Sequence, residues 1–548
     1  MKKLLLLFFL LPTISWLRAQ DDEGDLRLEL EFFGEAEAYY VNHMGADGLV
    51  LFYPTDSVNA FGERMWSFIR YTSDFIRIWD RQIMARPGLN YTRHTWDRTS
   101  LHVLLMSEKP LKKRRVQILS LNTETGDLAE MDGLIPYNLK LNDFSAVRNI
   151  AYIGGETQPT KFENTARRIG AVLVIPTFLG ITQNEPEAVH YMADMNEQKF
   201  KRFRYDYGGV ASVQRQAPNY KARSMSTTIY HSPSRKEDHL YIKEYAGDKL
   251  IRNLEVSPKS DRRILTGHTM HLNRDEFIVA GTYSQAYFRQ KFFKRIGLFF
   301  SGERLPPNAN GIYITKIGYR GQVFTEFYNF AQFENFWEVY KPKVKRKVKR
   351  KQKRKEKKGK EVILNFKLLM HDVIETEDTY LLVAEVYEEE YKREAVRDFR
   401  TGMMQNTGRQ YFAGYKYTHA IAAAFNKKDG KMIWDNSFPI NNLLSMDLRE
   451  RVEVLPGPDS TIMIYSQGPY LQSRTIQEGE VLEPRQIKKM TGEFSGGRIG
   501  FESDITHWFD NYFLAWGYEQ PRKEEGLLSS FRSQEKKPQR VFLYRIGY

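Results

Sequence analysis

Three separated stretches of the sequence share one spacing: a short apolar strand, a polar turn that contains a glycine, and a second apolar strand. They run from Leu121 to Leu128, from Lys316 to Val323 and from Phe425 to Met432. Glycine supplies the positive φ that a tight hairpin turn needs, and the polar residues before it suit such a turn. The spacing therefore predicts a repeated antiparallel hairpin, which is typical of a closed or stacked β architecture.

A second recurring element is a turn with Asp or Asn followed by four to six strand-forming residues. Its copies begin at Asp47, Asp97, Asn149, Asp238, Asp275, Asp378, Asp459 and Asp510. Several steps between copies are close to fifty residues, which is the spacing expected of propeller blades of four strands each. We predict an all-β protein formed by a single β-propeller of about seven four-stranded blades, with six and eight as the alternatives.

Two of the steps are longer and need their own explanation. The step from Asp275 to Asp378 contains a basic insertion and a further strand, so it predicts one blade with a long loop. The step from Asn149 to Asp238 predicts a degenerate blade around Val172 to Pro176. Most apolar runs are continuous rather than alternating, which fits strands covered on both faces by neighbouring blades.

The two ends of the chain predict how the ring closes. The last residues, Val541 to Tyr548, are similar to Ile312 to Tyr319, but the chain ends where a further strand would follow. The segment from Leu26 to Phe33 alternates apolar and charged residues and can supply that missing outer strand. We expect the N-terminal and C-terminal strands to pair, which removes exposed sheet edges.

The first residues indicate export. Lys2 and Lys3 precede the uninterrupted apolar run from Leu4 to Leu11, and a cleavage site before Gln20 is expected, so residues 1–19 read as a signal peptide and 20–548 as the propeller. The 548 residues include no cysteine, which excludes disulfides, thiolate metal sites and a cysteine nucleophile. No later segment is apolar and long enough for a membrane-spanning helix. We expect a periplasmic or secreted protein.

The positive charge is concentrated in one block. Residues 341–360 contain 14 Lys or Arg and one Glu, so they carry all but one of the +14 net charge of the chain. Such a block repels itself, and it predicts a disordered basic loop inserted within a blade. Contact with an anionic surface is the alternative, and nucleic acid is not an expected partner. The candidate anion-contact residues are Lys345, Arg346, Lys347, Lys349, Arg350, Lys351, Lys353, Arg354 and Lys355.

The segment from Ala424 to Trp434, with its Asp429-Gly430 turn and a Trp four residues after the Gly, resembles the tryptophan-docking repeat of quinoprotein-like β-propellers of bacterial envelopes. The other two hairpins lack the Trp. The resemblance implies the propeller fold and an envelope location. It implies no activity, because no quinone or metal ligand of that family has a counterpart here, and we predict no cofactor.

Other candidate sites are weak. His268 and His271 with Asp275 stand in a predicted strand, where residues three apart point to opposite faces, so no metal site is predicted. Gly492 to Gly497 contains a serine out of register for a hydrolase nucleophile. Glu388 to Glu390 is expected to be a solvated face. The aromatic residues near strand ends are expected to pack between blades; they are Trp96, Trp508, Tyr512, Trp516 and Tyr518.

These observations favour a non-enzymatic binding or scaffold protein of the bacterial cell envelope, whose partner is an envelope protein or glycan. One alternative is a glycan hydrolase or lyase on the same ring, which requires carboxylates that converge within about 5 to 9.5 Å. Another alternative is an adaptor that binds anionic surfaces through residues 341–360. The sequence names no catalytic residue, and enzymatic activity stays undecided.

Overall fold

The structure is a computed structural model, and almost all of its regular structure is β. It describes residues 18–19, 25–32, 39–108, 113–157, 186–205, 207–234, 237–258, 262–285, 308–358, 362–397, 404–457, 460–490, 498–499, 503–520 and 539–548. These residues form eight antiparallel sheets of four to six strands, which we call blades 1 to 8 in chain order.

The first four blades each contain four strands in sequence order. Blade 1 contains β3 (Tyr40–His43), β4 (Leu49–Val58), β5 (Arg64–Tyr71) and β6 (Arg77–Ala85). Blade 2 contains β7 (Leu89–Trp96), β8 (Ser100–Ser107), β9 (Lys113–Asn122) and β10 (Leu128–Pro136). Blade 3 contains β11 (Leu139–Val147), β12 (Ile150–Thr157), β13 (Ala188–Asp194) and β14 (Lys199–Phe203). Blade 4 contains β15 (Val210–Asn219), β16 (Ser224–Ser234), β17 (Glu237–Ala246) and β18 (Lys249–Val256).

The last four blades vary the same plan. Blade 5 contains β19 (Arg263–Ile264), β20 (His268–His271), β21 (Phe277–Ser284), β22 (Gly311–Gly318) and β23 (Gly321–Asn329). Blade 6 contains β24 (Lys367–Met370), β25 (Ile374–Glu375), β26 (Thr379–Arg397), β27 (Met404–Asn426) and β28 (Met432–Ser445). Blade 7 contains β29 (Val452–Pro456), β30 (Thr461–Gln467), β31 (Tyr470–Gln477) and β32 (Glu480–Lys489). Blade 8 joins β1 (Arg18–Ala19) and β2 (Leu26–Phe32) to β33 (Arg498–Ile499), β34 (Asp504–Phe509), β35 (Tyr512–Gln520) and β36 (Gln539–Gly547).

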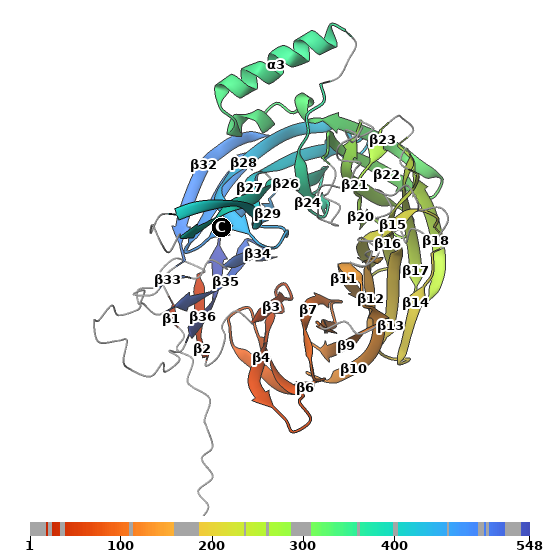
Figure 1. Ribbon diagram of the computed structural model, residues 1–548, viewed down its shortest axis with the longest axis vertical. Helices are drawn as coiled ribbons and strands as arrows, with labels where there is room; N and C mark the ends of the chain where they lie inside the picture. Colours follow the sequence, from red (N-terminus) through yellow and green to blue (C-terminus); the bar gives the residue numbers. More distant parts are fainter. Residues whose placement is uncertain are drawn as a thin grey trace, which may run out of the picture.

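The blades are arranged in a ring, with the first strand of each blade toward the centre (Figure 1). Every pair of successive blades shares a cluster of buried apolar side chains, so the core is divided into layers between the sheets. Middle strands such as β13 and β21 are buried along their whole length, because neighbouring blades cover both faces. The continuous apolar runs of the sequence are explained by this arrangement.

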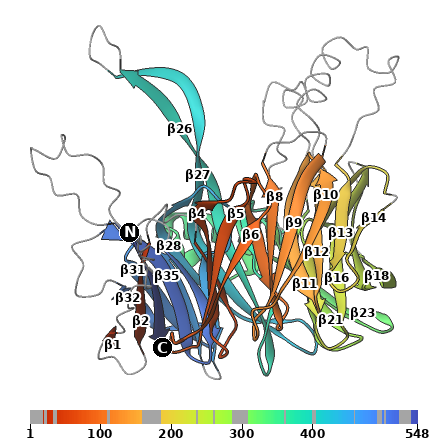
Figure 2. The same ribbon diagram turned by 90° about the horizontal axis from the view of Figure 1, so that it is seen from below.

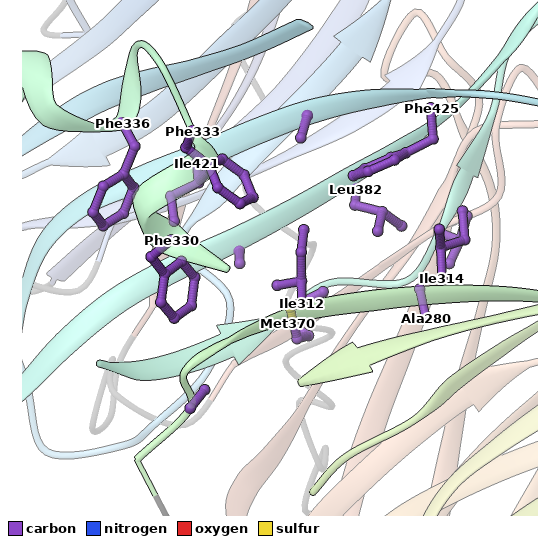
Figure 3. Close-up of a cluster of buried hydrophobic side chains, with 14 of the residues drawn as sticks. Ala280, Ile312, Ile314, Phe330, Phe333, Phe336, Met370, Leu382, Ile421 and Phe425 are labelled. Carbon is purple, nitrogen blue, oxygen red and sulfur yellow. The ribbon is translucent and has the colours of Figure 1, made fainter. Parts of the chain in front are cut away.

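The layer between blades 5 and 6 shows how such an interface is built (Figure 3). Ile312 and Ile314 of β22 face Leu382 of β26 and Phe425 of β27 across the interface. Two short 3-10 helices, η2 (Phe330–Gln332) and η3 (Phe336–Val339), add a cluster of aromatic rings at the edge of this layer. They connect the last strand of blade 5 to the basic insertion.

The ring closes between blades 8 and 1. Strand β2 pairs with β36 in antiparallel register, from Leu26 opposite Arg545 to Phe32 opposite Gln539. The predicted pairing of the N-terminal and C-terminal strands is confirmed. Across the closing interface the indole of Trp508 stacks on Phe75 and donates a hydrogen bond of 3.2 Å to the carbonyl of Gly48.

The sequence analysis predicts about seven blades, and the described residues form eight sheets, one of its two alternatives. Each of the eight Asp/Asn turn elements precedes or begins a strand of a different blade. The long step from Asn149 to Asp238 contains the 30 residues that separate β12 from β13. In addition, the first element leads into the second strand of blade 3, whereas the other begins the third strand of blade 4. Residues Val172 to Pro176, where a degenerate blade is predicted, lie outside the described residues.

The three glycine hairpins that opened the sequence analysis occupy equivalent places. Each joins the third strand of a blade to its outer strand: β9 to β10, β22 to β23, and β27 to β28. Gly126, Gly321 and Gly430 all have positive φ, between +72° and +112°, as the turn requires. The predicted hairpins are therefore confirmed as the outer edges of blades 2, 5 and 6.

The basic insertion is more ordered than the sequence predicts. Residues 341–360 are predicted to be a disordered loop, but Pro342–Glu356 form the helix α3 at the outside of the ring (Figure 1). Lys and Arg have good helix propensity, and Pro342 at the first turn is compatible with a helix start. Val348 packs against the apolar layer between blades 5 and 6, which fixes the helix despite its charge. In the described part of the chain, no helix is long and apolar enough to cross a membrane.

Blade 6 carries the most extended feature of the ring. Strands β26 and β27 pair over a length far beyond that of the other blades and project from one face of the ring (Figure 2). Three register shifts along the pair increase its local twist. The buried part of β26 ends at Tyr387, and the Glu388 to Glu390 segment lies directly beyond it.

Candidate functional site

The innermost strands of blades 2 to 6 share an irregularity. In β7, β11 and β15 one extra residue interrupts the pairing with the second strand, between Tyr91 and Arg93, between Leu141 and Asp143, and between Val213 and Arg215. In blades 5 and 6 the same place is a break, which separates β19 from β20 and β24 from β25. Bulges of this kind redirect side chains and are frequent beside functional sites.

Polar and charged side chains gather at these bulges and at the adjoining segments of blades 7 and 8. We call them the central belt: Arg93, Asp143, Arg215, His268, His371, Asp372, Arg449, Glu450, Glu453 and Asp504. They come from the first strands of seven blades or from the residues beside those strands. The sequence analysis names only His268 among them.

Arg215 of β15 is the centre of the belt. Its guanidinium donates two hydrogen bonds to the carboxylate of Asp372, of 3.1 Å from Nε and 2.7 Å from Nη2. The imidazole of His268 lies 3.1 Å from the same carboxylate. Protein around Asp372 disfavours its charge, but Arg215 and then His268 outweigh this and hold the pKa of Asp372 well below its usual range. Asp372 first, and then Asp143 and Glu450, raise the pKa of Arg215.

Glu450 brings a second carboxylate to Arg215. Its Oε1 lies 3.9 Å from Nη2, the atom that also binds Asp372. The two carboxylate oxygens are therefore within about 7 Å of each other, in the range found for the paired carboxyl groups of glycosidases. Asp372 remains 63% exposed and Glu450 35% exposed, so both carboxylates are open to solvent.

His371, the neighbour of Asp372, belongs to a buried ion pair. Its Nε2 lies 2.8 Å from Oε1 of Glu385, which also accepts the backbone amides of Arg451 and Val452. Burial alone would lower the pKa of His371, but Glu385, Glu450 and Glu453 raise it to about 9. The imidazole is therefore positively charged at neutral pH, and its partner Glu385 ties blade 6 to the first strand of blade 7 through the two backbone amides.

Glu453 is a carboxyl group of the belt that is protonated at neutral pH. Burial raises its pKa to about 8, Glu450 and Asp504 add to the shift, and the backbone amide of His507 and the charge of His371 offset part of it. That amide donates to Oε2 of Glu453 at 3.2 Å. Glu450 and Glu453 are thus neighbouring carboxyl groups in different environments, which is the arrangement of an acid and base pair.

In blades 1 and 2 the belt is continued by groups that are uncharged at neutral pH. Burial lowers the pKa of His43 and of His94 to about 4 each, so both imidazoles are neutral at pH 7. The ring of Tyr40 stacks on that of Tyr91 at 3.6 Å between centroids, and the hydroxyl of Tyr91 lies 2.7 Å from Nδ1 of His94. The site therefore has a charged half and an aromatic half.

The predicted candidates lie elsewhere in the ring. The nine candidate anion-contact residues from Lys345 to Lys355 all lie on α3, outside the belt. His268 contacts Asp372, whereas His271 contacts Asn219 at 3.1 Å, so the two histidines have different partners. Among the described residues no three His, Asp or Glu side chains are grouped as metal ligands would be. Residues Gly492 to Gly497 lie outside the described residues.

The predicted aromatic residues are mostly structural. Trp508 and Tyr518 are buried, and Trp96 and Trp516 are half-buried against the layers between blades. Tyr512 lies beneath the guanidinium of Arg545 at 4.9 Å. The expectation that Glu388 to Glu390 is a solvated face is wrong for Glu389, whose carboxylate is 7% exposed and forms an ion pair with Lys367.

Trp434, the residue that completes the tryptophan-docking pattern, contacts the next blade. Its side chain lies against Gly479, in the turn between β31 and β32, where a Cβ atom would meet Cβ of Trp434 at 2.6 Å. Asn335 and Asn436 both donate to the carbonyl of Gly479. Trp434 therefore connects blades 6 and 7 and has no contact with the central belt.

Comparisons with known proteins add little to this geometry. No protein-family model matches the sequence, and no curated protein is significantly similar to it. Among solved structures, polysaccharide lyase Uly1 is 8% identical with a TM-score of 0.35, covering 84% of this chain and 89% of that chain. The propeller domain of the trilobed protease from Pyrococcus furiosus is 9% identical with a TM-score of 0.30, covering 78% and 91%. The apocarotenoid oxygenase of Synechocystis is 9% identical with a TM-score of 0.32, covering 74% and 71%.

Proposed function

We propose that the central belt is an acid and base site that cleaves a glycosidic bond. The observation that supports this most is the pair Glu450 and Glu453, two adjacent carboxyl groups of which one faces Arg215 and the other has a pKa of about 8. Glu453 is protonated at neutral pH and can donate a proton, and Glu450 is half-exposed and can accept one. A carboxyl group that keeps its proton at neutral pH, beside a second carboxyl group, is what glycoside hydrolysis requires.

The proposed reaction is hydrolysis. Glu453 gives its proton to the glycosidic oxygen as the bond from that oxygen to the anomeric carbon breaks. Glu450 removes a proton from the water whose oxygen forms the new bond to that carbon. The products are a hydroxyl on one sugar and a hemiacetal on the other. Glu450 then releases its proton to solvent and Glu453 takes one up from solvent, which restores both carboxyl groups. Arg215, fixed by Asp372, orients Glu450 and offers positive charge to an acidic sugar.

The aromatic half of the belt supports a sugar as the ligand. The rings of Tyr40 and Tyr91 stack on each other and are half-buried, and we assign the part that stays exposed to contact with a pyranose ring. We further propose that the substrate is a polysaccharide of the bacterial envelope, on the basis of the predicted signal peptide in residues 1–19 and the tryptophan-docking resemblance of Ala424 to Trp434.

A test compares Glu453→Gln and Glu450→Gln with the wild-type protein. The probes are peptidoglycan, alginate and pectate, and the release of new reducing ends is measured. Each substitution is expected to reduce the rate on the cleaved polymer by about a hundredfold or more, because proton transfer is lost. The matched control is Glu480→Gln, on the exposed outer strand of the same blade. Equal rates in all four proteins would contradict the proposed acid and base.

A second candidate is a binding protein that cleaves nothing. It is favoured by the structural use of carboxylates in and beside the belt. Asp143 of the belt accepts the backbone amide of Gln216, and Glu385, the partner of His371, accepts two amides of blade 7. Affinity electrophoresis in the same polysaccharides separates the two candidates. Retarded migration without release of reducing ends from any of them supports a binding protein, and the tryptophan-docking resemblance is compatible with either.

A further inference from the structure

The helix α3 has two different faces. Lys345, Val348, Gln352 and Lys355 are half-buried, and their spacing of three and four residues places them on one side of the helix. Val348 on this side packs against the apolar layer between blades 5 and 6. This inner face therefore rests on the ring, and it fixes the direction in which the rest of the helix points.

The outer face consists almost entirely of cations. Every other residue from Pro342 to Arg354 is exposed, and Val344 is the one apolar residue among them. No ion pair joins these outer cations to a carboxylate of the described residues. The outer cations are Lys343, Arg346, Lys347, Lys349, Arg350, Lys351, Lys353 and Arg354.

This arrangement has an energetic cost within the protein. Pairs such as Arg346 and Arg350, or Lys347 and Lys351, are four residues apart and repel each other on the helix surface. Outside residues 341–360 the chain has a net charge of only +1, so the rest of the ring offers little compensation. An anionic partner would relieve this repulsion.

We propose that the outer face of α3 binds the surface of a bilayer that contains anionic phospholipids. The helix is a straight rod of about 22 Å, held on one side by the ring, so many of its cations can meet a flat surface together. Exposed Lys341, Lys357 and Lys358 extend the charged line at both ends. The outer face has too little apolar surface to enter the acyl layer, so the contact is with headgroup phosphates and depends on salt.

The test uses the full chain and sedimentation with vesicles of phosphatidylcholine, with and without about 30 mol % phosphatidylglycerol. Wild-type protein is expected to bind only the anionic vesicles and to lose about tenfold or more in affinity when NaCl rises from about 0.05 M to about 0.5 M. A variant with four glutamines on the outer face is expected to lose affinity for the anionic vesicles by a similar factor. It carries Lys347→Gln, Arg350→Gln, Lys351→Gln and Arg354→Gln.

The matched control removes four positive charges from exposed positions elsewhere on the ring. It is expected to bind anionic vesicles as the wild type does. It carries Lys221→Gln, Lys249→Gln, Lys416→Gln and Lys489→Gln. Equal loss in both variants, binding that is insensitive to salt, or no binding to anionic vesicles would overturn the proposal. Binding of alginate or DNA through α3 without vesicle binding would also overturn it. Circular dichroism and the melting temperature establish that both variants are folded.

Discussion

The guanidinium of Arg215 binds both carboxylate oxygens of Asp372, although the two residues belong to blades 4 and 6, with blade 5 between them. His268 of blade 5 joins the same carboxylate. Three successive blades thus meet at one carboxylate. These hydrogen bonds can form only when blades 4, 5 and 6 are curved into the ring. Their presence therefore depends on the arrangement of the three blades as well as on the two side chains.

Arg215→Lys and Asp372→Asn are each expected to lower the melting temperature by about 1 to 2 °C, and the double variant by no more than the worse single one. Lysine keeps the charge but loses the two-pronged hydrogen bond. The effect is small because Asp372 is 63% exposed and water screens the pair. Differential scanning calorimetry of the three variants measures it, and additive losses would show that the two residues act independently.

His371 predicts a loss of stability at alkaline pH. The pKa of this imidazole is raised from about 6.5 to about 9 in the folded protein, so its contribution is fully present below pH 6.5 and is lost as the pH rises through about 9. The melting temperature of the wild type should therefore fall between these limits. His371→Gln should be less stable at pH 6 but should show a flatter decline, and an unchanged slope would count against the ion pair with Glu385.

Glu453 predicts the pH dependence of the proposed hydrolysis. The reaction needs this carboxyl group protonated, and its pKa is about 8. The rate kcat/KM should therefore be maintained through neutral pH and should decrease above about pH 8. The measurement is kcat/KM from pH 5 to 10 on the polysaccharide that the protein cleaves. A decrease that begins near pH 5 would mean that a different group donates the proton.

The framework of this protein could be predicted from its sequence, because the signals that set it are local. A glycine such as Gly126 determines its own turn, and an Asp or Asn turn directly precedes most of the strands that identify the blades. The repeats alone do not determine the number of blades, because the elements at Asn149 and Asp238 lead into strands at different places in their blades. The helix α3 was missed because its stabilising contact, through Val348, is with a distant layer.

The central belt was not predicted because its residues are far apart in the sequence. Arg215 and Asp372 are separated by 157 positions, and only the closed ring brings them together. One feature of the sequence does point to the belt. Asp143 follows Arg93 by one blade repeat, and each stands after a polar residue, Asn142 or Thr92, in the middle of a first strand. Polar pairs that recur at the blade repeat, in the middle of first strands, indicate bulges that face the centre.

The glycine hairpins have different neighbours. The same substitution to alanine should therefore lower the free energy of unfolding by different amounts. At Gly430 a Cβ atom would lie 2.5 Å from the ring of Phe324 in blade 5, whereas at Gly321 it would meet nothing within 4 Å. Both residues have positive φ, so alanine strains both turns by about 1 kcal/mol. Gly430→Ala should cost about 1 to 3 kcal/mol more because it also displaces Phe324. Urea denaturation of the two variants measures the difference, and equal midpoints would contradict it.

The closing interface predicts the largest loss of stability. Leu28 of β2 is 1% exposed and packs with Leu514 and Leu543 of blade 8 in the layer that faces blade 1. Leu28→Ala removes buried apolar atoms at the junction of the chain ends and should destabilise the protein by about 2 to 5 kcal/mol.

Leu30→Ala is the matched control for this substitution. Leu30 lies two residues further along the same strand and is only half-buried, so truncation to alanine should cost clearly less. Urea denaturation followed by tryptophan fluorescence suits this comparison, because Trp508 lies in the same layer. If the ring is held mainly by its other layers, Leu28→Ala and Leu30→Ala will unfold at the same urea concentration, and closure through β2 and β36 will then contribute little to stability.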